Sequence, residues 1–259
     1  MSAGKVYLVG AGPGDPELLT LKAVRVIGEA DVVVYDRLVP AGILANIRDG
    51  VAQINVGKQA NFHPVPQSEI NEMLVRLARA GRTVVRLKGG DPFIFGRGCE
   101  EAAELEAAGV PYEIIPGITA AQGCAASARV PLTHRGLATG VRYVTGHRKV
   151  NEPLELDWKG LADPETTLVV YMGLANIGEI VANLTAQGLP ADTPVLAVCH
   201  GTTLQEQRLS TRLEALPALA QEAAFTGPVL FIIGRVAGIA MERSEHSNAT
   251  DSGAISVVA

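Results

Sequence analysis

Residues 10–15 read GAGPGD and directly follow the strand-like run KVYLV at residues 5–9. Two glycines one residue apart behind a strand are typical of a nucleotide-binding loop, but Asp15 stands where the dinucleotide fingerprint has its third glycine. Asp15, Pro16 and Glu17 predict a helix start, with a capping carboxylate, a proline in the first position and an acid in the first turn. Because a phosphate there would meet two carboxylates, the loop favours a ligand without phosphate.

Two other interpretations of this loop stay open at this point. Asp36, at the end of DVVVYD, lies about where an NAD-dependent enzyme has its ribose-binding acid, so a dinucleotide is one alternative. A tight strand-to-helix turn without any ligand is the other. Pro13 stiffens the loop and removes a backbone donor, which suits close approach of the backbone to a ligand better than binding of an anion.

Composition excludes several classes of function. The chain has 259 residues, 47% of them hydrophobic, and a net charge of -5, which argues against nucleic-acid binding. Three cysteines far apart and without CxxC spacing predict neither a disulfide framework nor a zinc site, and we expect no metal. The N-terminus leads straight into a strand and no long apolar segment follows, so we expect a cytoplasmic protein without a membrane span.

Strand-like and helix-periodic segments alternate along the whole chain, which predicts the α/β class. We expect two α/β domains, at residues 1–115 and 120–241, joined near IIPGITAA, with the ligand in the cleft between them. Residues 16–30 are expected to form one helix. The alternating stretch QEQRLST predicts a half-exposed strand and some antiparallel pairing in the second domain. Residues 242–259 are small and polar, and are expected to form a flexible tail.

The segment RLKGGDPFIFGRGCEE, at residues 86–101, has the most unusual composition. Gly89 and Gly90 end a predicted strand, where their backbone groups can face a ligand, and Asp91 starts a turn. Arg97 stands between glycines. It can form an ion pair with Glu100 or with the next glutamate, which would order the loop, or its guanidinium can bind a ligand carboxylate, which we favour.

Further charged residues follow other predicted strands. Arg37 in YDRLV, Arg135 in PLTHRG and His147 in VTGH would each, taken alone, be ordinary loop residues. Their joint placement at strand ends indicates a ligand site, because open α/β sheets bind ligands at the carboxyl ends of their strands. Met172 in YMG is either a core or rim methionine or a cover for an adenine or a sulfonium methyl group. Motifs of serine hydrolases, P-loop kinases and zinc proteases do not occur.

The motifs GAGPGD, YDRLV, RLKGGDPFIFGRG, PGITA, PLTHRG, VTGH, YMG and GTT occur in this order. With them, residues 5–236 closely resemble the uroporphyrinogen-III C-methyltransferases, in the tetrapyrrole branch of the class III S-adenosylmethionine-dependent methyltransferases. The resemblance implies the tetrapyrrole methylase fold, a homodimer, S-adenosyl-L-methionine as methyl donor and S-adenosyl-L-homocysteine as product. It further implies methylation of uroporphyrinogen III at C2 and C7, giving precorrin-2 through precorrin-1, for siroheme, cobalamin or haem d1. A later corrin-pathway methyltransferase and a non-catalytic tetrapyrrole-binding module are the alternatives.

The same resemblance assigns residues. It implies catalytic roles for Arg97 and Glu100, and contacts of Arg37, Arg135 and His147 with the substrate. The cofactor contacts that it implies are Pro13, Gly89, Gly90, Asp91, Ile94, Thr119, Ala120, Met172, Gly201 and Thr202. Cys99 stands where many members have glycine. The dehydrogenase and ferrochelatase module of fused siroheme synthases is not part of this sequence, so we expect precorrin-2 as the end product.

Overall fold

The computed structural model describes residues 4–57, 65–147 and 154–243. The chain divides into two compact units, Met1–Gly123 and Cys124–Ala259, and the division falls within helix α5 (Ala120–Ser127). Most of the predicted tail lies outside the described residues. Its first two residues, Glu242 and Arg243, instead continue a helical segment that begins at Gly238.

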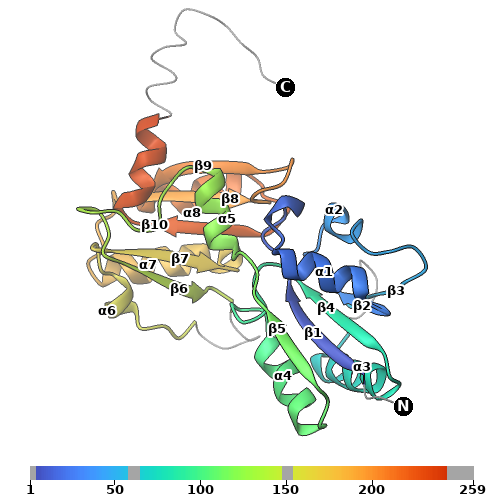
Figure 1. The fold of residues 1–259 in the computed structure, drawn as a ribbon. Coiled ribbons are helices and arrows are strands. Elements are labelled where there is room, and N and C mark those ends of the chain that lie inside the picture. Colours follow the sequence, from blue (N-terminus) through green and yellow to red (C-terminus); the bar gives the residue numbers. More distant parts are fainter. Residues whose placement is uncertain (1–3, 58–64, 148–153, 244–259) are drawn as a thin grey trace, which may run out of the picture. The chain divides into compact units, whose positions relative to one another are not determined.

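The first unit is built on a five-stranded parallel sheet in the order β3-β2-β4-β1-β5 (Figure 1). Its strands are β1 (Lys5–Gly10), β2 (Val32–Tyr35), β3 (Ala52–Asn55), β4 (Thr83–Lys88) and β5 (Tyr112–Ile115). Its helices are η1 (Pro16–Leu18), α1 (Leu21–Glu29), α2 (Ala41–Leu44), α3 (Gln67–Arg79) and α4 (Gly98–Ala107). A parallel sheet with crossover helices is what the alternating sequence pattern predicts.

Helices cover both faces of this sheet, so each face has its own apolar core. Leu8 of β1 and Val84 of β4 pack with Leu74 of α3 and Leu105 of α4. Next to them in sequence, Val9 and Val85 face the other way and pack with residues of α1 and α2. The alternation follows from the pleat, which sends successive side chains of a strand to opposite faces.

The predicted helix over residues 16–30 is wrong as a single element. Asp15 does cap a helix start, since its Oδ1 accepts a hydrogen bond from the Glu17 amide at 2.9 Å. That helix is the single 3-10 turn η1, however, and Thr20 then starts α1 by accepting from the Ala23 amide at 3.1 Å. Because the Thr20 hydroxyl caps a new helix at this point, the turn η1 does not continue into α1 as one helix.

The second unit contains a mixed five-stranded sheet in the order β6-β7-β10-β8-β9. Its strands are β6 (Gly140–Thr145), β7 (Thr166–Tyr171), β8 (Pro194–Cys199), β9 (Gln207–Arg212) and β10 (Val229–Ile233). Its helices are α6 (Trp158–Leu161), η2 (Leu174–Asn176), α7 (Ile177–Ala186), η3 (Leu213–Ala215), α8 (Leu216–Glu222) and η4 (Arg235–Ala237). β6 and β7 are parallel, and the pairs that involve β9 or β10 are antiparallel, as the QEQRLST pattern predicts.

Candidate functional site

The loops behind β1, β2, β4 and β5 lie at one edge of the first sheet, because parallel strands have their carboxyl ends on the same side. Pro13, Arg37 and Thr119 lie in three of these loops, and Gly89, Gly90, Asp91 and Ile94 lie in the fourth. The structure therefore brings the predicted residues of the first unit to one sheet edge.

Three glycines let the backbones at this edge approach closely. A Cβ atom on Gly10 would lie 2.5 Å from the Gly117 nitrogen and 2.7 Å from the Gly90 oxygen. Gly90 also exchanges two backbone hydrogen bonds with Gly12, of 3.1 and 2.7 Å. The Gly90 amide and carbonyl therefore already have a partner in Gly12, and of the two only the carbonyl oxygen keeps a lone pair for a ligand. The positive φ of Gly90, 67°, explains why glycine is needed there.

The carboxylate of Asp91 organises the loop that follows. Its Oδ1 accepts from the Phe93 amide at 2.8 Å and its Oδ2 from the Gly117 amide at 3.0 Å. The Asp91 carbonyl accepts from the amide of Ile94, which is half-buried. Asp91 thus ties the β4 loop to the β5 loop, which shapes the surface offered to a ligand.

Arg97 and Glu100 form a two-pronged ion pair at the start of α4. Arg97 Nε lies 2.8 Å from Glu100 Oε1, and the second bond, to Oε2, is 2.6 Å long. The hydrogen bond from Arg97 lowers the pKa of Glu100, and the same bond raises the pKa of Arg97. The pair is half exposed, so the guanidinium holds its charge at the surface of the loop, where it can meet an anionic ligand.

Thr119 and Ala120 lie at the start of α5, behind β5. Thr119 is buried, and its hydroxyl accepts from the Gln122 amide at 3.2 Å. The Gln122 side chain in turn accepts from the Thr119 amide and hydroxyl. These bonds fix the first turn of α5, and half-buried Ala120 is the residue of this turn that begins the helix.

In the second unit, the carboxyl ends of β6, β7 and β8 lie at one edge of the sheet, since β8 is antiparallel to β10 and β10 to β7. His147, Met172, Gly201 and Thr202 follow these strands. Met172 is 49% exposed, whereas a methionine in the core would be buried. The structure thus brings these four predicted residues to a common edge.

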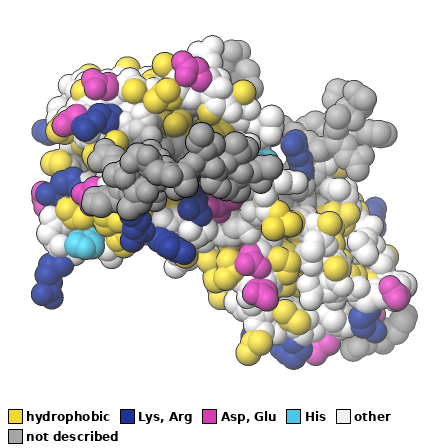
Figure 2. Space-filling model, turned by 90° about the horizontal axis from the view of Figure 1, so that it is seen from above, with side chains coloured by type: hydrophobic (Ala, Val, Ile, Leu, Met, Phe, Trp, Pro, Cys, Tyr) yellow, Lys and Arg dark blue, Asp and Glu magenta, His cyan; other side chains and the backbone are white. Residues whose placement is uncertain are grey.

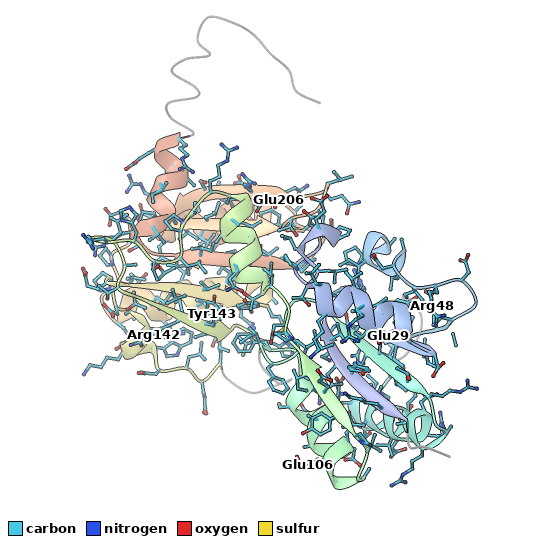
Figure 3. All side chains as sticks on the ribbon, in the orientation of Figure 1. Glu29, Arg48, Glu106, Arg142, Tyr143 and Glu206 are labelled. Atoms are coloured by element: carbon cyan, nitrogen blue, oxygen red, sulfur yellow. The ribbon has the colours of Figure 1, made fainter. Side chains whose placement is uncertain are left out.

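The loop behind β8 is held by Glu206, labelled in Figure 3. Its Oε2 accepts from the Thr202 amide at 2.6 Å, and its Oε1 accepts from Arg208 Nε at the same distance. Gly201 packs directly on Cys124, leaving no space for a side chain. Burial raises the pKa of the Cys124 thiol to about 12, so this cysteine is a packing residue rather than a nucleophile.

Arg135 lies elsewhere in the second unit. It belongs to a turn closed by the bridge between His134 and Ala138, and this turn precedes the amino end of β6. The expectation that Arg135 follows a strand end is therefore corrected. It lies toward the sheet edge opposite to His147, because β6 runs between the two.

Backbone strain coincides with these loops. Seven non-glycine residues of the described part of the chain have φ between 46° and 64°. Five of them lie in the loops just described, namely Phe95, Arg97, Met172, His200 and Thr202. Such conformations cost about 1–3 kcal/mol each and cluster at functional sites, so they point to these strand ends independently of the motifs.

The sequence analysis missed a buried charge cluster beside the site. Arg86, Lys88 and Glu101 are at most 3% exposed, and Glu101 Oε1 accepts from Arg86 Nε and from Lys88 Nζ, both at 3.0 Å. Arg86 and Lys88 alternate along β4 and therefore share one face of the sheet. Two cations at alternate positions of a strand that is otherwise apolar are the signal that could have revealed a buried acidic partner.

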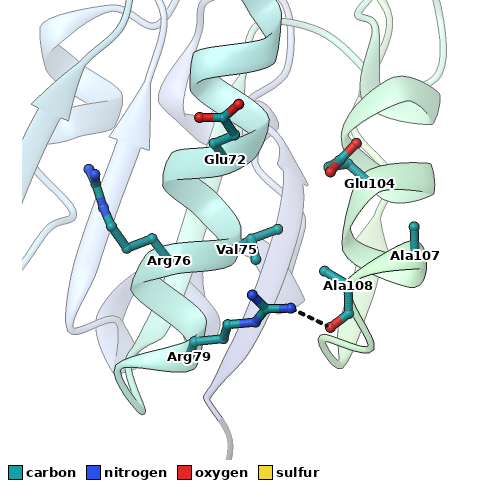
Figure 4. A pocket seen from close by; sticks show the side chains of 7 residues that line it. All are labelled: Glu72, Val75, Arg76, Arg79, Glu104, Ala107 and Ala108. Carbon is teal, nitrogen blue, oxygen red and sulfur yellow. Dashed lines mark hydrogen bonds between the residues drawn. The ribbon is translucent and has the colours of Figure 1, made fainter.

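A groove elsewhere on the first unit is unrelated to these residues. It has a volume of about 480 Å³ and lies between α3 and α4, where Arg76 and Arg79 line it with Glu72 and Glu104 (Figure 4). Acidic and basic side chains are also interspersed over the face shown in Figure 2.

Among the described residues, no group of three His, Cys, Asp or Glu side chains could hold a metal ion, and no helix is long and apolar enough to cross a membrane.

Comparison with known proteins identifies the class to which these features belong. A family model for tetrapyrrole (corrin/porphyrin) methylases matches residues 5–217, and the chain belongs to this family. A uroporphyrinogen-III C-methyltransferase of Paracoccus denitrificans is 58% identical over 237 residues, which cover 92% of this chain and 83% of that protein. A siroheme synthase of Nitrosospira multiformis is 52% identical over 91% of this chain, which spans only 50% of that longer protein.

A solved structure has the same fold. The uroporphyrin-III C-methyltransferase of Thermus thermophilus, complexed with S-adenosyl homocysteine, superposes with a TM-score of 0.77 at 43% identity. The match covers 90% of this chain and 93% of that structure. The α/β class and the tetrapyrrole methylase fold expected from the sequence are confirmed.

Proposed function

We propose that this chain transfers methyl groups from S-adenosyl-L-methionine to C2 and C7 of uroporphyrinogen III, giving precorrin-2 through precorrin-1. The observation that carries this proposal is the 58% identity with the Paracoccus denitrificans C-methyltransferase over 92% of the chain. The siroheme synthases support the same methylation but extend well beyond this sequence. Their further activities are not part of the proposal.

The residues of the first loop fit a methyl donor that carries a cationic sulfonium and no phosphate. The amides of Ala11 and Gly12, and that of Gly90, all donate to backbone carbonyls, and the Glu17 amide donates to Asp15. Few donors therefore remain for a pyrophosphate at this turn, and a dinucleotide is disfavoured. We propose that Pro13, Gly89, Gly90, Asp91, Ile94, Thr119, Ala120, Met172, Gly201 and Thr202 form the cofactor site.

The substrate is rich in carboxylates, and the proposed contacts provide cations for them. Arg97 and Arg37 stand on exposed loops of the same sheet edge, and the exposed rings of Phe93 and Phe95 offer apolar surface to a macrocycle. Glu100 holds the Arg97 fork in place from one side. We propose that His147 also contacts the substrate. Arg135 lies toward the opposite edge of the same sheet, so the structure does not support a contact beside His147.

The chemistry needs little more than alignment. When bound, S-adenosyl-L-methionine supplies an electrophilic methyl group, which the electron-rich pyrrole carbon attacks directly, so no enzyme nucleophile is required. Because its hydrogen bond to Glu100 raises the pKa of Arg97, Arg97 stays a cation, and we assign it to orientation of the substrate through its carboxylates. The proton that leaves the methylated carbon requires a separate acceptor.

The test is to incubate the purified protein with uroporphyrinogen III and S-adenosyl-L-methionine and to analyse the tetrapyrrole by mass spectrometry. The expected product carries two added methyl groups, and a reaction without methyl donor is the control. Binding of the tetrapyrrole without any methylation would favour the non-catalytic module. Methylation of a later corrin precursor in place of uroporphyrinogen III would favour another member of the family.

We also propose the assembly and the location that the resemblance implies. The protein would be a cytoplasmic homodimer of two-domain chains, with domains at residues 1–115 and 120–241. Light scattering coupled to size-exclusion chromatography tests the dimer, because a mass equal to one chain would contradict it. Cell fractionation tests the location.

A further inference from the structure

The buried cluster around Glu101 does not belong to the residues proposed to contact cofactor or substrate. Glu101 is fully buried, and its Oε1 receives hydrogen bonds from Arg86, Lys88 and Gln67 at 3.0, 3.0 and 3.2 Å. Its second oxygen has no hydrogen-bond partner among the described residues. Burying such charges is unfavourable, so a cluster of this kind indicates a role other than stability alone.

The cluster fixes Glu101 of α4 onto β4. Lys88 is the last residue of β4 and Glu101 lies in the first turn of α4, so their contact closes the loop of residues 89–97. Burial and the neighbouring Arg86 lower the pKa of Lys88, and Glu101 opposes this. The loop thus begins and ends at one buried polar contact.

The two ends of this loop are fastened differently. The end next to β4 is held by its own hydrogen bonds to neighbouring loops, because Gly90 pairs with Gly12 and Asp91 binds the Gly117 amide. At the far end, the bond from the Gly98 amide to the Pro92 carbonyl is internal to the loop and cannot fix it to the sheet.

Consecutive residues of a helix point about 100° apart, which explains how adjacent glutamates differ. Glu101 is buried against β4, while Glu100 is exposed and binds Arg97. The Arg97 backbone is left-handed, with a φ of 58°, and needs surrounding contacts to hold it. Its carbonyl accepts from the amides of both Glu100 and Glu101, at 3.1 and 3.3 Å.

We propose that Glu101, held from β4 by Lys88 and Arg86, is a positioning residue that fixes the Arg97–Glu100 pair for methyl transfer. This inference rests on the proposed function, since it assigns a task to the same site. Glu101 acts through the first turn of α4 and touches neither substrate nor cofactor.

The test uses two variants of the full chain. Glu101→Asp keeps the charge but withdraws the carboxylate by one methylene, whereas Lys88→Met leaves only Arg86 and Gln67 to hold Glu101. We expect amide hydrogen exchange at residues 95–101 of the free protein to rise about ten-fold in Glu101→Asp, and by less in Lys88→Met. The turnover number should fall about ten- to a hundred-fold in Glu101→Asp. The Kd for S-adenosyl-L-homocysteine should stay within about two-fold of the wild-type value, because separate hydrogen bonds hold the end of the loop next to β4.

Lys5→Met is the matched control. It removes the Lys5–Glu113 pair at the opposite edge of the same sheet, and it should leave exchange at residues 95–101, turnover and Kd unchanged. Unchanged exchange in both cluster variants, or a parallel loss of cofactor affinity, would overturn the proposal. Failure of both variants to fold would overturn it as well, since the cluster would then serve the fold itself. A wild-type protein without methyl transfer would refute the proposed function. The hydrogen-exchange result would still test whether Glu101 fixes the Arg97–Glu100 pair.

Discussion

Replacing Gly117 with alanine should destabilise the first unit. A Cβ atom at Gly117 would lie 2.8 Å from the Gly10 Cα and closer still to the Gly90 carbonyl oxygen, and both are backbone atoms that cannot rotate away. The β5 loop must therefore move outward. That movement stretches the bond between the Gly117 amide and the Asp91 carboxylate, which is 3.0 Å long.

The magnitude follows from these contacts. Overpacking costs about 1–3 kcal/mol, and weakening a hydrogen bond to a charged group adds about 1–2 kcal/mol. The alanine lowers the entropy of the unfolded chain, which returns about 0.4–1 kcal/mol. The free energy of unfolding should fall by about 2–4 kcal/mol, which corresponds to a decrease in Tm of about 5–15 °C for a chain of this size.

Urea denaturation followed by far-ultraviolet circular dichroism measures this change. The single tryptophan, Trp158, lies in the second unit, so its fluorescence gives a separate signal for that unit and should move less. Gly28→Ala is the matched control, because Gly28 is inside α1 with no atom within 4 Å of the added carbon, and this change should stabilise by about 0.5–1 kcal/mol. If Gly117→Ala unfolds within about 0.5 kcal/mol of the wild type, the close backbone approach is not the constraint that we describe.

Three further predictions concern single side chains. Arg97→Ala should reduce methyl transfer by at least about a hundred-fold while calorimetry finds cofactor affinity nearly unchanged, and an equal loss of affinity would contradict the role of Arg97 toward the substrate. Met172→Lys should weaken binding of S-adenosyl-L-methionine by placing a cation near its sulfonium, and unchanged affinity would remove Met172 from the cofactor site. Hydrogen bonds from Lys22 and Lys5 lower the pKa of Glu113 to about 2, so its contribution is complete above about pH 4.5 and is lost as the pH falls toward 2. Since the pair is partly exposed, Glu113→Gln should cost under about 1 kcal/mol at pH 7, and urea titrations of variant and wild type should converge near pH 2.

The strands and the loops of the site were predictable because short-range patterns determine them. Apolar alternation sets the strands, and the left-handed or closely packed turns behind them require glycine at Gly10 and Gly90. The Asp15 cap involves residues two positions apart, so the sequence alone indicated it. The Arg97–Glu100 pair, three positions apart, was one of the alternatives that the sequence offered for Arg97. Such features depend on local geometry, which a linear sequence expresses directly.

Long-range placement was not predictable in the same way. Whether the Gly90 amide is available to a ligand depends on Gly12, which lies in the loop behind another strand. The position of Arg135 depends on the path of a turn before β6, and the burial of Glu101 depends on which face of β4 carries Arg86. In each case the deciding partner is far away along the chain, and local spacing carries no information about it.

The adjacent glutamates at the start of α4 join both kinds of information. Because a helix turns about 100° per residue, only one of the two can face solvent and bind Arg97 while the other faces the sheet. Two cations on the inward face of β4 fix which one is buried, since Arg86 and Lys88 need a carboxylate there. The direction of the exposed Arg97–Glu100 pair is thus determined by the buried side chains of the cluster, which do not contact a ligand. A substitution in the buried cluster should therefore alter catalysis at a surface that it does not touch.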